Sequence, residues 1–438
     1  MSSGELDRRE AAGCPVKHDL SGPFASATLA DPAILAAPNA FYKAVRTEDP
    51  VHYDEKLEMY LVSRYDDLQA VFRDPLTYSV KKGFSANLAK GFQEEFKAAL
   101  EAEGGRVMQN PFSDPPEHTR LRRLMEGAFN AHRVKQLEPE IRAVTVKLIE
   151  EVLERGSAEI VGEFAVPLTS AIICAQLGID LPSETIQRWS NAGTAQIGRM
   201  TTREDMYAAV KDIAANQKFI RAQVEDRLKN PKEDMISDLV HAKLEGETEE
   251  LSRLSVDEAC ALTGAILTAG NETTATAITN MFFFLATKPE IAATLRKSVD
   301  DDRLVNRFVE ELLRIEAPVR GLTRMTTREV ELGGVTLPEG SHLLLLYASA
   351  NDDESQFPHP REFDLERNNL GRHMTFGGGI HRCIGASLAR MELAVTAREI
   401  ITRMDNFKLA IPLEEVRFKP TLAVRAIDEL PMTFTRRA

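Results

Sequence analysis

A single cysteine within a glycine-rich loop constrains this chain more than any other feature. The loop spans residues 376–385, Phe-Gly-Gly-Gly-Ile-His-Arg-Cys-Ile-Gly, and an apolar helical pattern follows over residues 386–404. Three consecutive glycines let the backbone adopt positive φ and approach a flat ligand without Cβ clashes. Helix amides and the neighbouring Arg382 and His381 both favour the thiolate of Cys383. The loop therefore predicts a solitary, activated thiolate.

Several chemistries use an isolated thiolate. A zinc site would need further ligands, and no other cysteine is near in sequence. A phosphate loop would need Gly-Lys followed by Ser or Thr, which is absent. A nucleophile paired with a distant histidine stays open, because the base can lie far away in sequence. Burial as a packing residue is the usual state of a lone cysteine, and we expect it for Cys174 and Cys260.

A long central helix is expected over residues 255–288. Ser255 and Glu258 form a capping box, and Pro289 marks the far boundary. About 32 residues give a rod of roughly 48 Å, long enough to cross a domain. Its apolar pattern is interrupted by Gly-Asn-Glu-Thr-Thr at residues 270–274, where a buried carboxylate needs a partner. This segment is either a kinked core helix with a solvated notch or an oxygen-binding groove.

Two pairs of charged residues have helical spacing. Glu311 and Arg314 lie three residues apart, which in isolation predicts an ordinary surface bridge. His118 and Arg122 lie four apart on a helix expected to open with Asp114 as its cap. They form either a solvated basic face or a clamp for a ligand.

The composition is that of a globular protein with a sizeable core. Of 438 residues, 43% are hydrophobic and 28% are charged, and the net charge of -13 argues against nucleic acid and anionic membrane surfaces as partners. Four scattered cysteines do not form a disulfide framework and fit a reducing compartment. The polar start and the lack of long apolar runs predict neither signal peptide nor membrane span, so we expect a cytoplasmic protein.

The pattern along the chain predicts a mostly α fold with minor β (α+β). Residues 1–35 are expected to form a loosely ordered tail, and residues 36–438 a single domain. Helices are expected through residues 115–313, and residues 77–112 are expected to carry binding function. Strand signals occur at residues 51–63, 330–332, 335–337, 343–347 and 418–434.

The cysteine loop resembles the haem-binding loop of the cytochrome P-450 superfamily, Phe-x-x-Gly-x-His/Arg-x-Cys-x-Gly, at every defining position. Ala-Ser-Leu-Ala-Arg, at residues 386–390, is typical of the bacterial members. The resemblance covers about residues 40–430 and includes four motifs in the family's order. It implies the cytochrome P-450 fold, with haem b (iron protoporphyrin IX) between the central helix and the loop, and Cys383 as the iron ligand.

The resemblance also implies roles for other residues. The central segment is similar to the family's distal-helix motif, in which Thr273 would stabilise oxygen at the iron and Glu272 would relay protons. This pair argues against peroxide-using members and against a mere haem sensor. Further haem contacts would come from His118, Arg122, Arg324, His381, Phe376, Gly377, Gly385, Ala269 and Gly270. Glu311, Arg314 and a third partner, Arg367, would support the fold and the haem loop.

The resemblance implies a monooxygenase that inserts one atom of O2 by hydroxylation or O-dealkylation. The expected pocket is apolar and favours a small hydrophobic terpenoid, steroid, fatty or aromatic substrate. Arg320 would either turn outward or pair with a substrate carboxylate. The residues expected to line the pocket, besides parts of 80–110, are Ile266, Val319, Arg320, Leu322, Leu422 and Ala423.

No flavin or iron–sulfur domain is expected in the chain. Electrons would come from a separate ferredoxin and an NAD(P)H-dependent ferredoxin reductase, and the protein would act as a monomer. Arg120, Arg123, Arg382 and Arg390 would form a basic docking face or remain solvated surface charges. Two alternatives are a non-catalytic haem-thiolate sensor or binding protein and a cysteine hydrolase.

Overall fold

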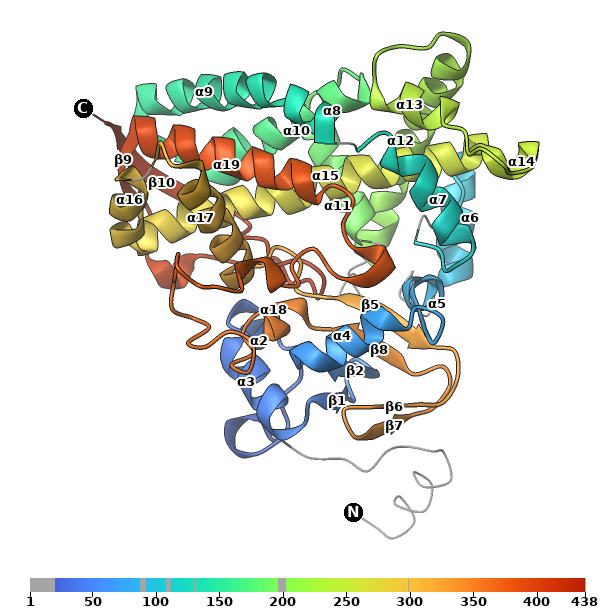
Figure 1. The fold of residues 1–438 in the computed structure, drawn as a ribbon, viewed down its shortest axis with the longest axis horizontal. Helices are drawn as coiled ribbons and strands as arrows, with labels where there is room; N and C mark the ends of the chain where they lie inside the picture. Colours follow the sequence, from blue (N-terminus) through green and yellow to red (C-terminus); the bar gives the residue numbers. More distant parts are fainter. Residues whose placement is uncertain are drawn as a thin grey trace.

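A computed structural model describes residues 20–86, 92–107, 112–129, 131–195, 202–297 and 299–437 of the protein. A large helical region and a smaller region built around a sheet lie against each other (Figure 1). The predicted class, mostly α with minor β, is confirmed. Cys14 and portions of the tail and of the 77–112 segment lie outside the described residues.

The helical region begins where the sequence predicts it, after the paired prolines at 115 and 116. Helices α9 and α10 each end at a glycine in the left-handed conformation, Gly156 and Gly178, the usual way to stop a helix. The helices of this region are α7 (Glu117–Glu126), α8 (Ala131–Gln136), α9 (Glu138–Arg155), α10 (Val166–Leu177), α11 (Ser183–Ala195), α12 (Arg203–Lys229), α13 (Met235–His241), α14 (Glu249–Ser252), α15 (Val256–Thr287), α16 (Pro289–Arg296), α17 (Asp302–Ile315) and α19 (Ala386–Arg403), with a π-helical turn at Val161–Ala165.

Helix α15 is the central rod, and it packs against α10, α11, α12 and α19 (Figure 1). Both halves of its capping box form, with Ser255 accepting from the Glu258 amide. Residues 270–274 do not interrupt the helix, and Asn271 is buried with partners on neighbouring helices rather than solvated. Across the described ranges, the membrane-span criteria of length and apolarity are met by no helix.

The smaller region is organised by a five-stranded sheet of order β1-β2-β8-β5-β3. The pairs are antiparallel except β2–β8, which is parallel. Its strands are β1 (Val51–Asp54), β2 (Met59–Val62), β3 (Tyr78–Ser79), β5 (Leu322–Thr326) and β8 (His342–Leu345), and the associated helices are α3 (Asn39–Glu48), α4 (Tyr65–Arg73), α5 (Val80–Ser85) and α18 (Tyr347–Ala350). Helix α6 (Gln93–Ala102) packs instead against α12 of the helical region. The predicted hairpins at 51–63 and 330–337 are confirmed, the second as β6 (Val330–Leu332) and β7 (Val335–Leu337).

A separate three-stranded sheet, β4-β10-β9, corrects the sequence prediction. Residues 418–434 were predicted as β, but only β10 (Pro431–Arg436) forms a strand there. The other β contacts of this stretch are isolated bridges. Strand β9 (Met404–Leu409) was not predicted, since it follows α19 without a turn signal. Strand β4 (Ser157–Glu159) interrupts the expected run of helices, because its edge pairs with β10.

Two local expectations near the N-terminal half are wrong. Residues 20–35 are not a loose tail, because Leu20, Leu29 and Leu35 are buried in a cluster with the sheet, and α2 (Pro32–Ala36) is capped by Asp31. Asp114 does not cap α7 with its side chain. Its carboxylate instead accepts the Val80 amide at 2.9 Å, so it joins α5 to the start of α7.

A buried charge network joins α17 to the chain that leads into the cysteine loop. Glu311 accepts from Arg314 Nε at 2.8 Å and from Arg367 Nε at 3.1 Å. Glu311 and Arg314 are completely buried, and Arg367 is nearly so. The guanidinium of Arg314 also donates to the carbonyl of Asn351 at 2.9 Å. The structure thus brings together the trio expected from the sequence, and it forms a buried network rather than a surface bridge.

Removal of the Glu311 carboxylate should destabilise the fold strongly. In the Glu311→Ala variant two buried guanidiniums lose their counter-charge, which should lower the free energy of unfolding by about 3–5 kcal/mol. Urea unfolding of the purified protein measures it. The control is Glu151→Ala, which removes an exposed partner of Lys147 on α9 and should change stability by less than about 1 kcal/mol. Similar small losses in both variants would contradict the network's structural role.

Candidate active site

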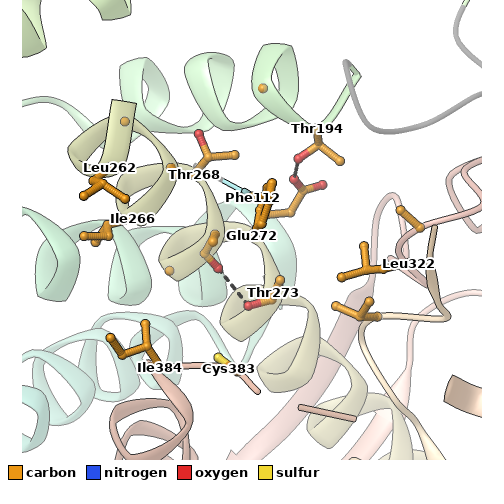
Figure 2. Close-up of a pocket in the computed structure, with 18 of the residues that line it drawn as sticks. Phe112, Thr194, Leu262, Ile266, Thr268, Glu272, Thr273, Leu322, Cys383 and Ile384 are labelled. Atoms are coloured by element: carbon orange, nitrogen blue, oxygen red, sulfur yellow. Dashed lines mark hydrogen bonds between the residues drawn. The ribbon is translucent and has the colours of Figure 1, made fainter. Parts of the chain in front are cut away.

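A cavity of about 540 Å³ lies between α15 and the cysteine loop. Its lining comes from helices α5, α6, α7, α10, α11, α12, α15 and α19, from strand β5, and from the loop itself. Cys383 lies at the floor of this space and Thr273, on α15, lies above it (Figure 2). The predicted thiolate and the predicted acid–threonine pair therefore face one cavity.

The Cys383 side chain is enclosed by the protein on the loop side and accessible from the cavity. Its amide donates to the Phe376 carbonyl at 2.9 Å, which closes the loop. Burial raises the pKa of the thiol, whereas the Gly385 amide and nearby arginines, Arg122 among them, lower it. These charges act in the direction predicted from the sequence, but burial outweighs them. Coordination to a metal would deprotonate the sulfur.

The predicted positive φ is confirmed at two glycines of the loop. Gly377 and Gly379 have φ of 66° and 61°, in the left-handed region. A Cβ at Gly378 would lie 2.4 Å from Cδ2 of Phe72, and one at Gly379 would lie 2.3 Å from the Phe72 carbonyl oxygen. These two glycines therefore also permit a close approach to α4, which the sequence did not indicate. The glycines thus fix where the loop rests on the fold.

The acid and the threonine of α15 have defined partners. The Thr273 hydroxyl donates to the Ala269 carbonyl at 2.8 Å. Buried Glu272 accepts a hydrogen bond from Thr194 of α11, as Figure 2 shows. Burial raises the pKa of Glu272, and the Thr194 hydrogen bond acts against it. A carboxyl with a raised pKa beside a cavity is suited to holding and passing a proton.

Four basic side chains gather on the side of the cavity next to the loop: His118, Arg122, Arg324 and His381. The two imidazole rings lie 4.1 Å apart between centroids, and Nδ1 of His118 and Nε2 of His381 are buried without a partner. Burial lowers the pKa of both, that of His381 to about 3. Arg122 has a carboxylate, that of Glu126, at 3.9 Å, whereas these two ring nitrogens could be satisfied by the paired carboxylates of a ligand.

This donor set fits haem. Of the two described cysteines that line the cavity, Cys383 is exposed to it and Cys260 is buried, and the described residues contain no group of three or more His, Cys, Asp or Glu able to hold a metal ion. An iron at Cys383 must therefore bring its own equatorial ligands, as a porphyrin does. The four basic side chains match the porphyrin's two carboxylates. Phe376, Gly377, Gly385, Ala269 and Gly270 line the same space.

Four of the predicted pocket residues line the cavity: Ile266, Val319, Leu322 and Ala423. Arg320 and Leu422 do not. Arg320 is fully buried and neither turns outward nor faces a substrate, since its guanidinium donates to the carbonyls of Val424, at 3.1 Å, and Leu35. Val319 bridges Val424 in extended backbone, where successive side chains point to opposite faces. That alternation sends Arg320 away from the cavity.

The expected basic docking face is largely neutralised. Arg390 donates to Glu310 at 2.6 Å and stacks 4.3 Å from the Phe376 ring centroid. Arg120 pairs with Glu258. Arg123 lies 3.6 Å from a carboxylate oxygen of Glu247. A docking role for this face stays a prediction that depends mainly on exposed Arg382.

The sequence analysis missed the part of the wall opposite the cysteine loop that comes from α11 and α12, which includes Trp189, Ile213 and Ile220. The rest of this wall comes from α6, whose Phe96 and Leu100 lie within the stretch 80–110 that was expected to contribute. The helical spacing of Ile213, Gln217 and Ile220 was the available signal. Which helix face covers a cavity depends on packing, which the spacing alone does not give.

A clamp between Gln217 and the backbone of Arg106 closes one edge of this wall, which forms the roof of the cavity. The Gln217 side chain accepts from the Arg106 amide and donates to the Arg106 carbonyl, both at 2.9 Å. The guanidiniums of Arg106 and Arg221 both bind Asp257, in the first turn of α15. The segment after α6 is therefore attached to α12 and α15.

Glu392 of α19 was also missed. It lines the cavity, is only 3% exposed, and its Oε2 has no hydrogen-bond partner. Burial raises the pKa of this carboxyl to about 8. The side chain is therefore largely protonated at neutral pH. Its position on the inner face of a helix gave no sequence signal that separated it from a surface glutamate.

The fold and site define a haem-thiolate oxygenase: a helical protein with one accessible thiol below an acid–threonine pair. Comparison with protein families gives a match to the model for Cytochrome P450 over residues 197–430. The 6-deoxyerythronolide B hydroxylase of Saccharopolyspora erythraea is 34% identical, over 86% of this chain and 90% of that one. The nocardicin C N-oxygenase of Nocardia uniformis is 33% identical, over 90% and 94%.

The chain belongs to the cytochrome P450 family; it is a monooxygenase, an oxidoreductase, and binds haem b. Solved structures agree on the fold. Cytochrome P450 CREJ in complex with (4-ethylphenyl) dihydrogen phosphate has a TM-score of 0.83 at 28% identity, covering 96% of this chain and all of that one. CYP109Q5 from Chondromyces apiculatus has a TM-score of 0.80 at 30% identity, covering 94% and 98%. The cysteine hydrolase alternative is wrong.

Replacing Glu392 with glutamine should change how stability depends on pH. Above the ordinary pKa of 4.5 the unfolded chain ionises this group, whereas the folded protein keeps it protonated up to about 8, so the free energy of unfolding falls across that interval. Glu392→Gln removes that fall. Between the two ends of the interval the wild type should lose about 4 kcal/mol relative to the variant. Urea unfolding across the interval measures it, and parallel profiles would contradict the assignment.

Proposed function

We propose that the protein inserts one atom of O2 into a small, mainly apolar organic substrate, by hydroxylation or O-dealkylation. The observation that carries this proposal is the placement of Cys383 and of Glu272 with Thr273 on opposite sides of one cavity. A non-catalytic haem-thiolate sensor would need the cysteine but not a buried acid held beside the cavity. The relatives named above, a hydroxylase and an N-oxygenase, also carry out oxygen insertion according to their names.

The chain's own residues would hold the cofactor both at its iron and at its two carboxylates. Cys383 would supply the sulfur ligand. His118, Arg122, Arg324 and His381 would bind the two carboxylates and orient the ring. When bound, haem supplies reductive activation of O2, favoured by the thiolate. The Glu311 trio holds the chain that leads into the loop, and so supports the position of the sulfur.

Proton delivery would start from Glu272. Its carboxyl is buried, has a raised pKa, and is held by the Thr194 hydroxyl, so it is suited to carrying a proton beside the cavity. The Thr273 hydroxyl, one residue further, would pass or stabilise that proton at the cavity surface. The Ala269 carbonyl fixes where this hydroxyl points.

The substrate would be bound mainly by apolar contacts. The walls are lined by aromatic and aliphatic side chains such as Phe84, Leu100, Ile266, Val319 and Leu322. Such walls exclude water and recognise shape. A substrate carboxylate paired with Arg320 is no longer proposed, because that guanidinium is buried away from the cavity.

Electrons would come from a separate ferredoxin and its NAD(P)H-dependent reductase. The exposed Arg382, next to the sulfur ligand, is the charge best placed to meet an acidic partner on the loop side. We further propose that the described residues from 20 onward form one catalytic domain. We also propose that the protein acts as a monomer.

Loss of the sulfur ligand should abolish the thiolate spectrum. The reduced carbon monoxide complex of the wild type should show the absorption of a thiolate-ligated haem. Cys383→Ala should lose that band and all oxygen insertion, because no other described thiol faces the cavity floor where the loop holds this sulfur. Cys174→Ala, a buried cysteine outside the cavity, is the matched control and should keep the band. A Cys383→Ala protein with an unchanged spectrum would overturn the proposed function.

Loss of the acid proton should slow turnover while haem binding remains. Glu272→Gln preserves shape but cannot release a proton, and we expect turnover to fall about 10²-fold. Product formation with a ferredoxin and reductase supplied in excess measures it, with the haem spectrum as a check on folding. The control is Glu290→Gln, an exposed first-turn residue of α16. Equal turnover in wild type and Glu272→Gln would exclude the proton-delivery role.

A further inference from the structure

Several polar side chains of the cavity already have partners. Thr194 binds Glu272, Thr273 binds the Ala269 carbonyl, and Gln217 uses both ends of its amide on the backbone of Arg106. None of these groups requires anything from a ligand.

Three other polar side chains that line the cavity each have a buried polar atom without a hydrogen-bond partner. Gln176 Oε1, Trp189 Nε1 and Asn216 Oδ1 are buried atoms without a hydrogen-bond partner. Gln176 is 6% and Trp189 5% exposed, so both side chains are enclosed by the protein.

The three come from consecutive helices that form one wall. Gln176 lies on α10, Trp189 on α11 and Asn216 on α12, and α11 packs against both of the others. The Trp189 ring lies 5.5 Å from that of Phe219, less than one turn after Asn216. All three residues line the cavity, so α10, α11 and α12 together form this wall.

An unpaired polar atom in a protein interior costs about 1–3 kcal/mol, and few are kept. A cluster of three along one cavity wall points to a ligand that satisfies them. We propose that this wall is a hydrogen-bonding subsite for a neutral, hydroxyl-bearing end of an otherwise apolar substrate. This inference rests on the proposed function, because it takes the cavity as the substrate site.

The donor and acceptor types select a hydroxyl. The Trp189 indole donates, whereas the carbonyl oxygens of Gln176 and Asn216 accept. A hydroxyl accepts from the indole and donates to a carbonyl, but an ether can only accept. A carboxylate would face two carbonyl oxygens. Arg106, the cation nearest this roof, is already paired with Asp257.

Trp189 is the chain's single tryptophan, so its fluorescence reports directly on this wall. The experiment titrates the haem-loaded protein with dodecan-1-ol, 1-methoxydodecane and dodecanoic acid, which share one chain and differ at the end group. Loss of one neutral hydrogen bond corresponds to about tenfold in affinity, so the alcohol should bind about tenfold tighter than the ether. The acid should bind most weakly.

Two apolar substitutions test the residues. Gln176→Leu and Asn216→Leu should reduce the preference for alcohol over ether toward one. The matched control is Gln187→Leu, which lies on α11 near Trp189 and also has an unpaired amide oxygen but is not among the lining residues. It should keep the wild-type preference.

Equal affinities for the three compounds in the wild type, tightest binding of the acid, or no response of Trp189 to any of them would each overturn the subsite. So would an unchanged preference in both leucine variants. The carbon monoxide spectrum is recorded on the same samples, so that a failure of haem-thiolate ligation is seen separately from a failure of this selectivity.

Discussion

The position of the cysteine loop depends on a buried network of three charges, all of which must be paired. Glu311 and its two arginines are buried, and each charge is tolerated only because the others neutralise it. The arginines also bind backbone carbonyls at Asn351 and Pro358, in the chain that approaches the loop. One set of pairings therefore fixes the path of that chain. This path, together with the packing of the loop glycines against Phe72, places the sulfur of Cys383.

The floor and roof of the cavity are built on different principles. On the floor, glycines let the loop rest against Phe72, and buried charges hold the segment before it. On the roof, α11 and α12 contribute mostly apolar side chains and a few polar ones. A rigid floor suits a reaction that every substrate shares, whereas the roof can vary with the molecule to be recognised.

Features encoded within a short stretch could be predicted from the sequence. The capping box at Ser255 and the proline at 289 give the bounds of α15 almost to the residue, and the resemblance of the cysteine loop to a haem-binding loop implies the cofactor. Features that depend on distant partners could not. Arg320 gave no sign that its partners would be the carbonyls of Leu35 and Val424, and Asp114 was expected to cap a helix rather than bind the Val80 amide. Glu392 resembled a surface residue until the packing of α19 enclosed it.

The clamp between Gln217 and the backbone of Arg106 has a kinetic consequence. Separation of the segment after α6 from α12 and α15 breaks both amide hydrogen bonds and the ion pair between Arg106 and Asp257. The ion pair is partly exposed, so added salt weakens it while leaving the amide hydrogen bonds intact. The rate of this separation therefore varies with ionic strength, whatever the charge of the bound molecule.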